Sequence, residues 1–268
     1  MWSGPGRDLA QAWRPSGISN PRGARYNSDD MSSSTHVAEP PVDLREVPPL
    51  EPGDRLTRAE FERRYAAMPQ LRKAELIEGV VYTPSPVRLR LHSRPHLHLA
   101  TWLGAYEAGT PGTVAADNST VRLDLDNEPQ PDLLLLIDPA VGGQTHVSED
   151  DYVEGAPELV AEIASSIASY DLNAKLNVYR RNGVREYVVW RVLDREIDWF
   201  TLREGRYEEL PRDSSGLYRS VVFPGLWLEP AAMVRGELAD VLDTLRQGLA
   251  TREHAAFVDR LEASRRST

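Results

Sequence analysis

The pattern of apolar and polar residues changes at about residue 57. Residues 1–50 contain 7 Pro, 7 Ser and 4 Gly, and follow neither the 3.6-residue period of a helix nor the two-residue period of a strand. Such a composition cannot offset the entropy of ordering the chain. We therefore expect a disordered arm over 1–50, a folded domain over 51–234 and a helical extension over 235–268. Met31 opens a polar stretch within the arm and is a candidate translation start.

Helical spacing of apolar residues appears in four segments. The first follows Thr57, which can cap it, and ends near Pro69; the second runs from about residue 91 to 108. The third begins at Ser169 and ends at Gly183, a residue suited to the C-terminal turn of a helix. The fourth, 237–263, is densely charged, which favours an exposed helix or a dimerisation arm.

Apolar and β-branched runs between these helices predict strands. The expected elements are a short hairpin or bent strand over 74–82 around Glu78-Gly79, strands over 114–124, 132–137, 158–164, 186–192 and 195–202, and edge strands to about 222. The strand over 132–137 is almost wholly apolar, as a strand covered on both faces should be. Residues 138–155 read as a polar loop. The order of the core is α-β-β-β-α-β, which predicts an α/β fold with a mixed sheet.

Composition narrows the class of protein. The chain has no cysteine, so it can form neither a disulfide nor a thiolate metal site, and a cytoplasmic location is expected. No apolar run approaches the roughly 18 residues of a membrane span, so no membrane contact is expected. The net charge of −10 argues against a passive nucleic-acid binder, which holds phosphates with excess Lys and Arg. A metal-dependent enzyme acting on DNA can still be acidic overall.

Two acids mark the ends of adjacent predicted strands. Asp132 begins one central strand and Glu162 lies near the end of the next. If the strands are neighbours, as consecutive strands usually are, the two carboxylates can share one divalent cation. Oxygen ligands of this kind select Mg²⁺, with Mn²⁺ as a substitute. Such a cation lowers the pKa of a bound water and neutralises charge that develops on a phosphate.

Lys175 is the basic residue that is a candidate to join Asp132 and Glu162. It lies at the border of the apolar arc of the third helix and could reach the sheet edge near Glu162, where it would orient water or hold a phosphate. Only 2 of the 31 basic residues are lysine, which favours a chemical requirement for Lys175. The competing interpretation is an i,i+4 pair with Asp171, worth about 0.2–0.5 kcal/mol of helix support.

Other polar residues have competing structural interpretations. Glu78 precedes Gly79 in a tight bend, where a carboxylate often caps the backbone, but it can also join the site as an acid. Glu162 lies in an apolar strand, where a charge is costly unless it is paired or binds metal. His92 can contact phosphate or cap the second helix. His92, His96 and His98 do not suggest zinc, because Pro95 interrupts them and no fourth ligand is obvious.

From about Thr57 to Met233 the chain resembles a bacterial family known as "putative restriction endonuclease", a branch of the PD-(D/E)XK nuclease superfamily. The matching segments are ELIEG at 75–79, PSP with His92 beyond it, TPG at 110–112, QPDLLL at 130–135, GAPELVAEIASSIASYDLNAKLNVYRRNGVREYVVW at 155–190 and FPGLWL at 223–228. One position departs from the simple superfamily motif. Ala164 stands two residues after Glu162, where lysine is expected, so Lys175 would have to act from the following helix, as in this branch.

The resemblance implies a restriction-endonuclease-like core with flanking helices and extra edge strands. It also implies Mg²⁺-dependent hydrolysis of DNA phosphodiester bonds by an active site of Asp132, Glu162 and Lys175, with Glu78 as an outer acid. We expect a homodimer that acts on DNA. The leading alternative is a catalytically inactive protein of the same fold that binds or regulates a partner, and a third is a structural oligomer built on the C-terminal helix.

Overall fold

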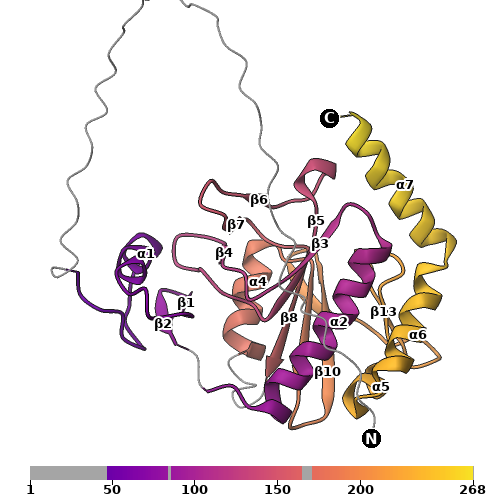
Figure 1. Cartoon of the computed structure of the whole chain (residues 1–268), viewed down its shortest axis with the longest axis horizontal. Helices are drawn as coiled ribbons and strands as arrows, with labels where there is room; N and C mark the ends of the chain where they lie inside the picture. The colour runs from indigo at the N-terminus through magenta and orange to yellow at the C-terminus, as the bar shows by residue number, and fades with distance from the viewer. Residues whose placement is uncertain (1–46, 84–85, 165–170, 268) are drawn as a thin grey trace, which may run out of the picture. The chain divides into compact units, whose positions relative to one another are not determined.

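A six-stranded mixed sheet forms the centre of the fold (Figure 1). The computed structural model describes residues 47–83, 86–164 and 171–267. The strands of this sheet are β3 (Thr113–Asp117), β5 (Leu133–Ile137), β8 (Leu159–Ala164), β9 (Glu186–Arg191), β10 (Glu196–Arg203) and β11 (Arg206–Glu209). They lie in the order β11-β10-β9-β8-β5-β3, with β8 and β9 parallel and the other neighbours antiparallel. The predicted α/β class with a mixed sheet is confirmed.

Helices lie on both faces of this sheet. They are α2 (Arg94–Gly109), α4 (Leu176–Asn182), α5 (Pro230–Arg235), α6 (Leu238–Leu249) and α7 (Arg252–Ser267), with short turns η1 (Leu89–Ser93), η2 (Pro139–Val141) and η3 (Asp171–Lys175). The remaining helix, α1 (Arg58–Ala66), packs with the N-terminal hairpin instead. Along β8, Leu159, Ala161 and Ile163 pack with α2, α5, α6 and α7, whereas Val160 and Ala164 pack on the α4 side. The chain order α2-β3-β5-β8-α4-β9 reproduces the predicted α-β-β-β-α-β core.

The C-terminal segment differs from the expected exposed helix. It forms two helices, α6 and α7, whose Val241, Leu245, Phe257 and Leu261 are buried in the main core. The charged residues occupy the other side of each helix, so dense charge did not mean full exposure. In the described ranges, no helix combines the length and apolar character that a membrane span needs.

The N-terminal part of the described chain holds α1 and a hairpin. Thr57 caps α1 by accepting a hydrogen bond from the backbone N–H of Glu60, as predicted. The hairpin pairs β1 (Glu75–Ile77) with β2 (Val80–Tyr82), and Glu78 and Gly79 at its turn have φ of 52° and 71°. Two consecutive positive φ values give the turn type that matches the twist of a two-residue hairpin. The predicted arm lies almost entirely outside the described residues, although its last residue, Leu50, is buried.

A predicted strand and a predicted loop are corrected by a small second sheet. Residues 114–124 do not form one strand, because Asn118 has a φ of 49° and turns the chain after β3. The continuation, β4 (Val121–Arg122), joins a sheet of order β4-β7-β6. Within the predicted loop lie β6 (His146–Val147) and β7 (Val153–Glu154). Of the edge strands expected up to about 222, β11 lies at the edge of the main sheet, whereas β12 (Tyr218–Arg219) pairs with β13 (Trp227–Leu228) in a separate two-stranded sheet.

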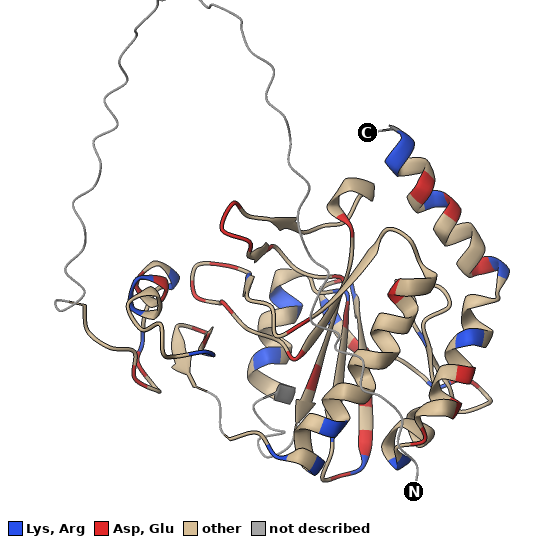
Figure 2. Cartoon of the chain, viewed as in Figure 1, with Lys and Arg blue, Asp and Glu red and all other residues tan. Residues whose placement is uncertain are grey.

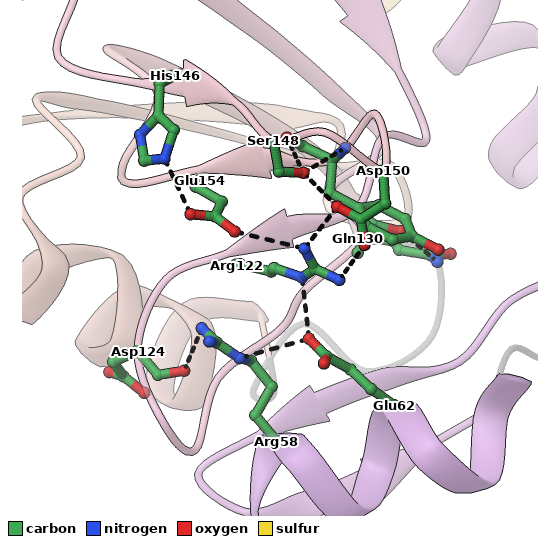
Figure 3. Close-up of polar contacts among 11 residues, drawn as sticks. Arg58, Glu62, Arg122, Asp124, Gln130, His146, Ser148, Asp150 and Glu154 are labelled. Carbon is green, nitrogen blue, oxygen red and sulfur yellow. Dashed lines mark hydrogen bonds and ion pairs between the residues drawn. The ribbon is translucent and has the colours of Figure 1, made fainter. Parts of the chain in front are cut away.

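Arg122 connects α1 to this small sheet (Figure 3). Its Nε donates to Glu62 of α1 at 2.9 Å, and Nη2 donates to Asp150 at 2.7 Å. Arg58 of α1 adds a bond from Nη1 to the backbone oxygen of Asp124 at 3.1 Å. These contacts fix α1 against β4, and α1 packs with the hairpin through the buried cluster that contains Phe61. The network therefore helps to position the hairpin that carries Glu75.

Candidate functional site

Asp132 and Glu162 face each other across two neighbouring strands. The register of β5 and β8 pairs Leu133 with Ala161, so the next position places Asp132 opposite Glu162. Both side chains are on the α4 face and both residues are buried, with 5% and 4% exposure. Asp132 Oδ2 accepts the backbone N–H of Ile163 at 2.8 Å, and Glu162 Oε2 lies 3.4 Å from the backbone nitrogen of Asp132. The structure thus brings together the two predicted carboxylates.

Lys175 joins this pair from the helical segment on the same face. Its Nζ is 2.8 Å from Glu162 Oε1, and the hydroxyl of Tyr179, one turn later, donates to the same oxygen at 2.9 Å. Lys175 ends η3 and α4 follows, closed by Gly183 with a φ of 88°. The predicted cap Ser169 and the side chain of Asp171 lie outside the described residues. The residue is only 4% exposed, so Lys175 does more than support a solvated helix face.

A further acid, Glu75, contacts Lys175 and was missed by sequence reasoning. Its Oε1 lies 3.0 Å from Lys175 Nζ and accepts the backbone N–H of Gln130 at 2.8 Å. Glu78, the predicted outer acid, is at the tip of the same hairpin, where its exposed carboxylate pairs with Arg181 at 2.8 Å. The structure therefore brings Glu75, and not Glu78, to the buried carboxylates.

Basic side chains lie around the other side of Asp132. Asp132 Oδ1 lies 3.2 Å from His92 Nε2 and 3.8 Å from Lys73 Nζ, while His96 Nε2 approaches the backbone oxygen of Asp132 at 3.0 Å. Burial by itself would raise the pKa of Asp132, but the hydrogen bond and charge of His92, with the charge of Lys73 and the N–H of Ile163, bring it down to about 2. Asp132 is therefore ionised at neutral pH. His98 turns away into the core, and burial lowers its pKa.

Both lysines of the sequence lie at this cluster. Lys175 pairs with Glu162 and Glu75, and Lys73 lies beside Asp132 and donates to Asn118 at 3.0 Å. The other 29 basic residues are arginine. The rarity of lysine was the signal that could have identified Lys73 from sequence alongside Lys175. A compact ammonium, unlike a guanidinium fork, can be held between closely spaced carboxylates.

Other buried acids have a different environment. Glu158 accepts backbone N–H groups of Ile137 and Gln144 at 2.9 and 3.0 Å. Glu186 accepts from the hydroxyl of Ser220 and the N–H of Val221, and burial raises its pKa to about 7. Each holds a loop to the end of a strand, with no ionic partner among the described residues. Burial of an acid in a strand is thus insufficient to identify a site; convergence of several ionised groups distinguishes Asp132 and Glu162.

The donor set fits a hard divalent cation. Asp132 and Glu162 offer carboxylate oxygens at one position of the sheet, and Mg²⁺ is usually held by one or two carboxylates with water and phosphate as its other ligands. Over the described ranges, no group of three or more acids or histidines has the arrangement of a complete protein cage for a metal. The residues therefore match an open two-carboxylate site rather than a closed structural one.

Comparison with known proteins identifies the family. Residues 58–231 match the family described as "Putative restriction endonuclease", and the chain belongs to that family. A search of curated proteins gave no match. Among solved structures, a "putative nuclease" from Anabaena variabilis is similar at 13% identity, over 64% of this chain and 97% of that chain, with a TM-score of 0.46.

Proposed function

We propose that this protein is a Mg²⁺-dependent endonuclease that hydrolyses DNA phosphodiester bonds. The observation that carries the proposal is the convergence of Asp132, Glu162 and Lys175, buried on one face of β5, β8 and the helix that follows. Membership of a family described as restriction endonucleases supports DNA as the substrate. Hydrolysis of a phosphodiester needs charge stabilisation at the phosphate and a positioned water, and these three residues have the right chemistry for both.

Asp132 and Glu162 would hold the Mg²⁺ ion, and Mn²⁺ would be able to substitute for it. When bound, a divalent cation supplies positive charge beside the scissile phosphate and makes water more acidic. The low pKa of Asp132 keeps its carboxylate ionised and ready to act as a ligand across the physiological pH range.

The surrounding residues have distinct roles in this proposal. Lys175 would place its ammonium against the attacking water or a phosphate oxygen, because Glu162 and Glu75 fix its Nζ from two sides. Tyr179 would orient Glu162 through its hydroxyl. His92 and Lys73 would leave Asp132 for the substrate phosphate once a cation neutralises that carboxylate. Glu75 thereby takes the outer-acid role that the sequence resemblance implied for Glu78.

One observation favours the alternative of an inactive binding protein. The acids Glu75, Asp132 and Glu162 are already accompanied by Lys73, His92 and Lys175, so the cluster is held together without an added cation. An inactive protein could keep this cluster as a buried ionic structure. Dependence on divalent metal separates the two functions, because only the nuclease needs it.

The test is conversion of supercoiled plasmid to nicked and linear forms. Purified protein with Mg²⁺ or Mn²⁺ should nick the plasmid, and EDTA should abolish the reaction. The substitutions Asp132→Asn and Glu162→Gln should each lower the rate of nicking by about 10²-fold or more. Glu208→Gln, an exposed acid on β11, is the matched control and should keep the wild-type rate. Absence of metal-dependent nicking by the wild-type protein would leave the binding protein as the better description.

We also propose a homodimer acting in the cytoplasm. One site of this kind cuts one strand, so double-strand cleavage in a single encounter needs two copies. Sedimentation of the purified chain should then give twice the monomer mass of 30.0 kDa.

A further inference from the structure

A segment beside the candidate site is basic and contains no acid. Residues 79–106 include no Asp or Glu, although the whole chain has a net charge of −10. Three arginines, Arg88, Arg90 and Arg94, fall within 7 positions of that segment. Figure 2 shows basic positions gathered at the start of α2, with no acidic position between them along the ribbon. Local charge here is therefore opposite to that of the chain as a whole.

Arg88 and Arg90 have no ionic partner in the part of the chain that the structure describes. Both are exposed, and neither forms an ion pair with any described residue. Some other exposed arginines are neutralised locally: Arg63 pairs with Glu60 at 2.7 Å, and Arg235 pairs with Glu237 at 2.6 Å. Exposed arginines without an ion pair also occur elsewhere among the described residues, as at Arg55 and Arg206, so Arg88 and Arg90 are distinguished by their place near His92 in a segment without acids. The positive charge of Arg88 and Arg90 thus remains available to a ligand.

Arg94 is oriented differently from the other two. A Cβ placed at Gly236, just after α5, would lie 3.5 Å from Arg94 Nη2. Arg94 therefore lies against the C-terminal end of α5, where the helix dipole favours a cation. We define the basic segment by Arg88 and Arg90 alone.

The basic segment is fixed to the candidate site through His92. The backbone N–H of His92 donates to the oxygen of Arg88 at 2.9 Å, and its side-chain Nε2 lies 3.2 Å from Asp132 Oδ1. His96 stacks on His92 with ring centroids 5.9 Å apart and lies 3.0 Å from the backbone oxygen of Asp132. Arg88 and Arg90 therefore lie four and two positions before His92, whose side chain contacts the buried Asp132.

We propose that Arg88 and Arg90 bind phosphates that neighbour the scissile phosphate of the nucleic-acid strand. These contacts would place the strand at Asp132. The inference rests on the proposed function for its substrate, but it concerns binding rather than hydrolysis. Guanidinium groups bind phosphate through paired hydrogen bonds. An acidic protein repels DNA over most of its surface, so its contact with the backbone must be concentrated where positive charge is unpaired.

Exposed apolar side chains next to these arginines fit the same ligand. Val87 and Leu89 are 64% and 72% exposed and alternate with Arg88 and Arg90. A nucleic-acid strand presents apolar sugar and base surfaces between its phosphates, so alternating basic and apolar side chains match both parts of it.

The test is fluorescence anisotropy with a labelled DNA duplex, measured in EDTA so that cleavage cannot interfere, over a series of KCl concentrations. Arg88→Ala/Arg90→Ala should weaken binding by about 10-fold or more and reduce the slope of log affinity against log salt by about 1–2, as expected for two lost phosphate contacts. The matched control, Arg203→Ala/Arg206→Ala, removes the same charge at the end of the sheet where β8 begins, away from Glu162, and should change neither quantity.

The outcomes separate this inference from the proposed function. The inference is supported if only the Arg88/Arg90 variant shows weaker binding and a smaller slope of log affinity against log salt. If the wild-type protein then fails to nick plasmid, hydrolysis is rejected but the binding inference stands. Equal binding by the wild-type and the Arg88/Arg90 variant overturns it, even if nicking is normal. Equal losses in both double variants, or no binding by the wild-type protein, also overturn it.

Discussion

Replacement of Lys175 by methionine removes one charge from a buried cluster while keeping nearly the same side-chain volume. Lys175 Nζ lies 2.8 Å from Glu162 Oε1 and 3.0 Å from Glu75 Oε1, and the three side chains are between 5% and 12% exposed. Removing one partner of a buried ion pair typically costs 3–5 kcal/mol, since the remaining charge is left uncompensated. At roughly 2–4 °C per kcal/mol for a domain of this size, Lys175→Met should lower Tm by about 6–20 °C.

Urea denaturation followed by circular dichroism measures this free energy of unfolding. Lys73→Met is the matched control, because Lys73 is 25% exposed and lies 3.8 Å from Asp132, so its loss should cost about 1 kcal/mol or less. A cost below about 1 kcal/mol for Lys175→Met would refute the buried cluster as described.

Three further predictions address the roles of single residues. Lys175→Arg keeps the charge but not the compact shape, so the rate of plasmid nicking should fall by about 10²-fold or more, and a wild-type rate would remove Lys175 from catalysis. Glu75→Gln should reduce nicking by about 10-fold or more whereas Glu78→Gln should leave it unchanged, and the reverse order would restore Glu78 as the outer acid. Burial raises the pKa of Glu186 from 4.5 to about 7, so the folded state keeps a proton that the unfolded state releases. The resulting stability, roughly 3 kcal/mol, is present below pH 4.5 and lost as pH rises through 7. Urea denaturation from pH 5 to 8 should show this decline in the wild-type protein and a flatter profile in Glu186→Gln; parallel profiles would contradict it.

The pairing of the two central strands, and with it the closeness of Asp132 and Glu162, was predictable because consecutive strands are usually neighbours in a sheet. Asp132 and Glu162 were assigned to the ends of consecutive strands, and the observed register places them opposite each other. Lys175 was expected to reach the sheet edge near Glu162 from the border of the apolar arc of its helix, and its Nζ lies 2.8 Å from Glu162 Oε1; the rarity of lysine in the chain pointed the same way. In each case a local pattern and one topological rule were sufficient.

Glu75 could not be chosen over Glu78 from local pattern. The two acids are three residues apart in one hairpin, and the turn was correctly expected at Glu78-Gly79. The hairpin turn exposes Glu78, whereas Glu75 reaches Lys175 only because β1 lies against residues 128–130, with Leu76 and Glu128 exchanging backbone hydrogen bonds. That contact joins segments more than 50 positions apart, which no periodicity reveals.

The C-terminal helices show the limit of reading charge as exposure. Their charged positions suggested an exposed arm. In α6, however, Val241, Leu245 and Gly248 recur at helical spacing and are buried. Such a stripe was legible in the sequence, and the high density of Arg, Asp and Glu on the opposite side obscured it.

We propose that Asp132 and Glu162 hold a divalent cation next to Lys175. The most direct test of this site is a crystal of the wild-type protein soaked in Mn²⁺ and measured for anomalous scattering. We expect one strong peak at ligand distance, about 2.1 Å, from carboxylate oxygens of both Asp132 and Glu162, and loss of that peak in a crystal of Asp132→Asn. A peak elsewhere, or an ordered site with no peak under saturating Mn²⁺, would contradict it.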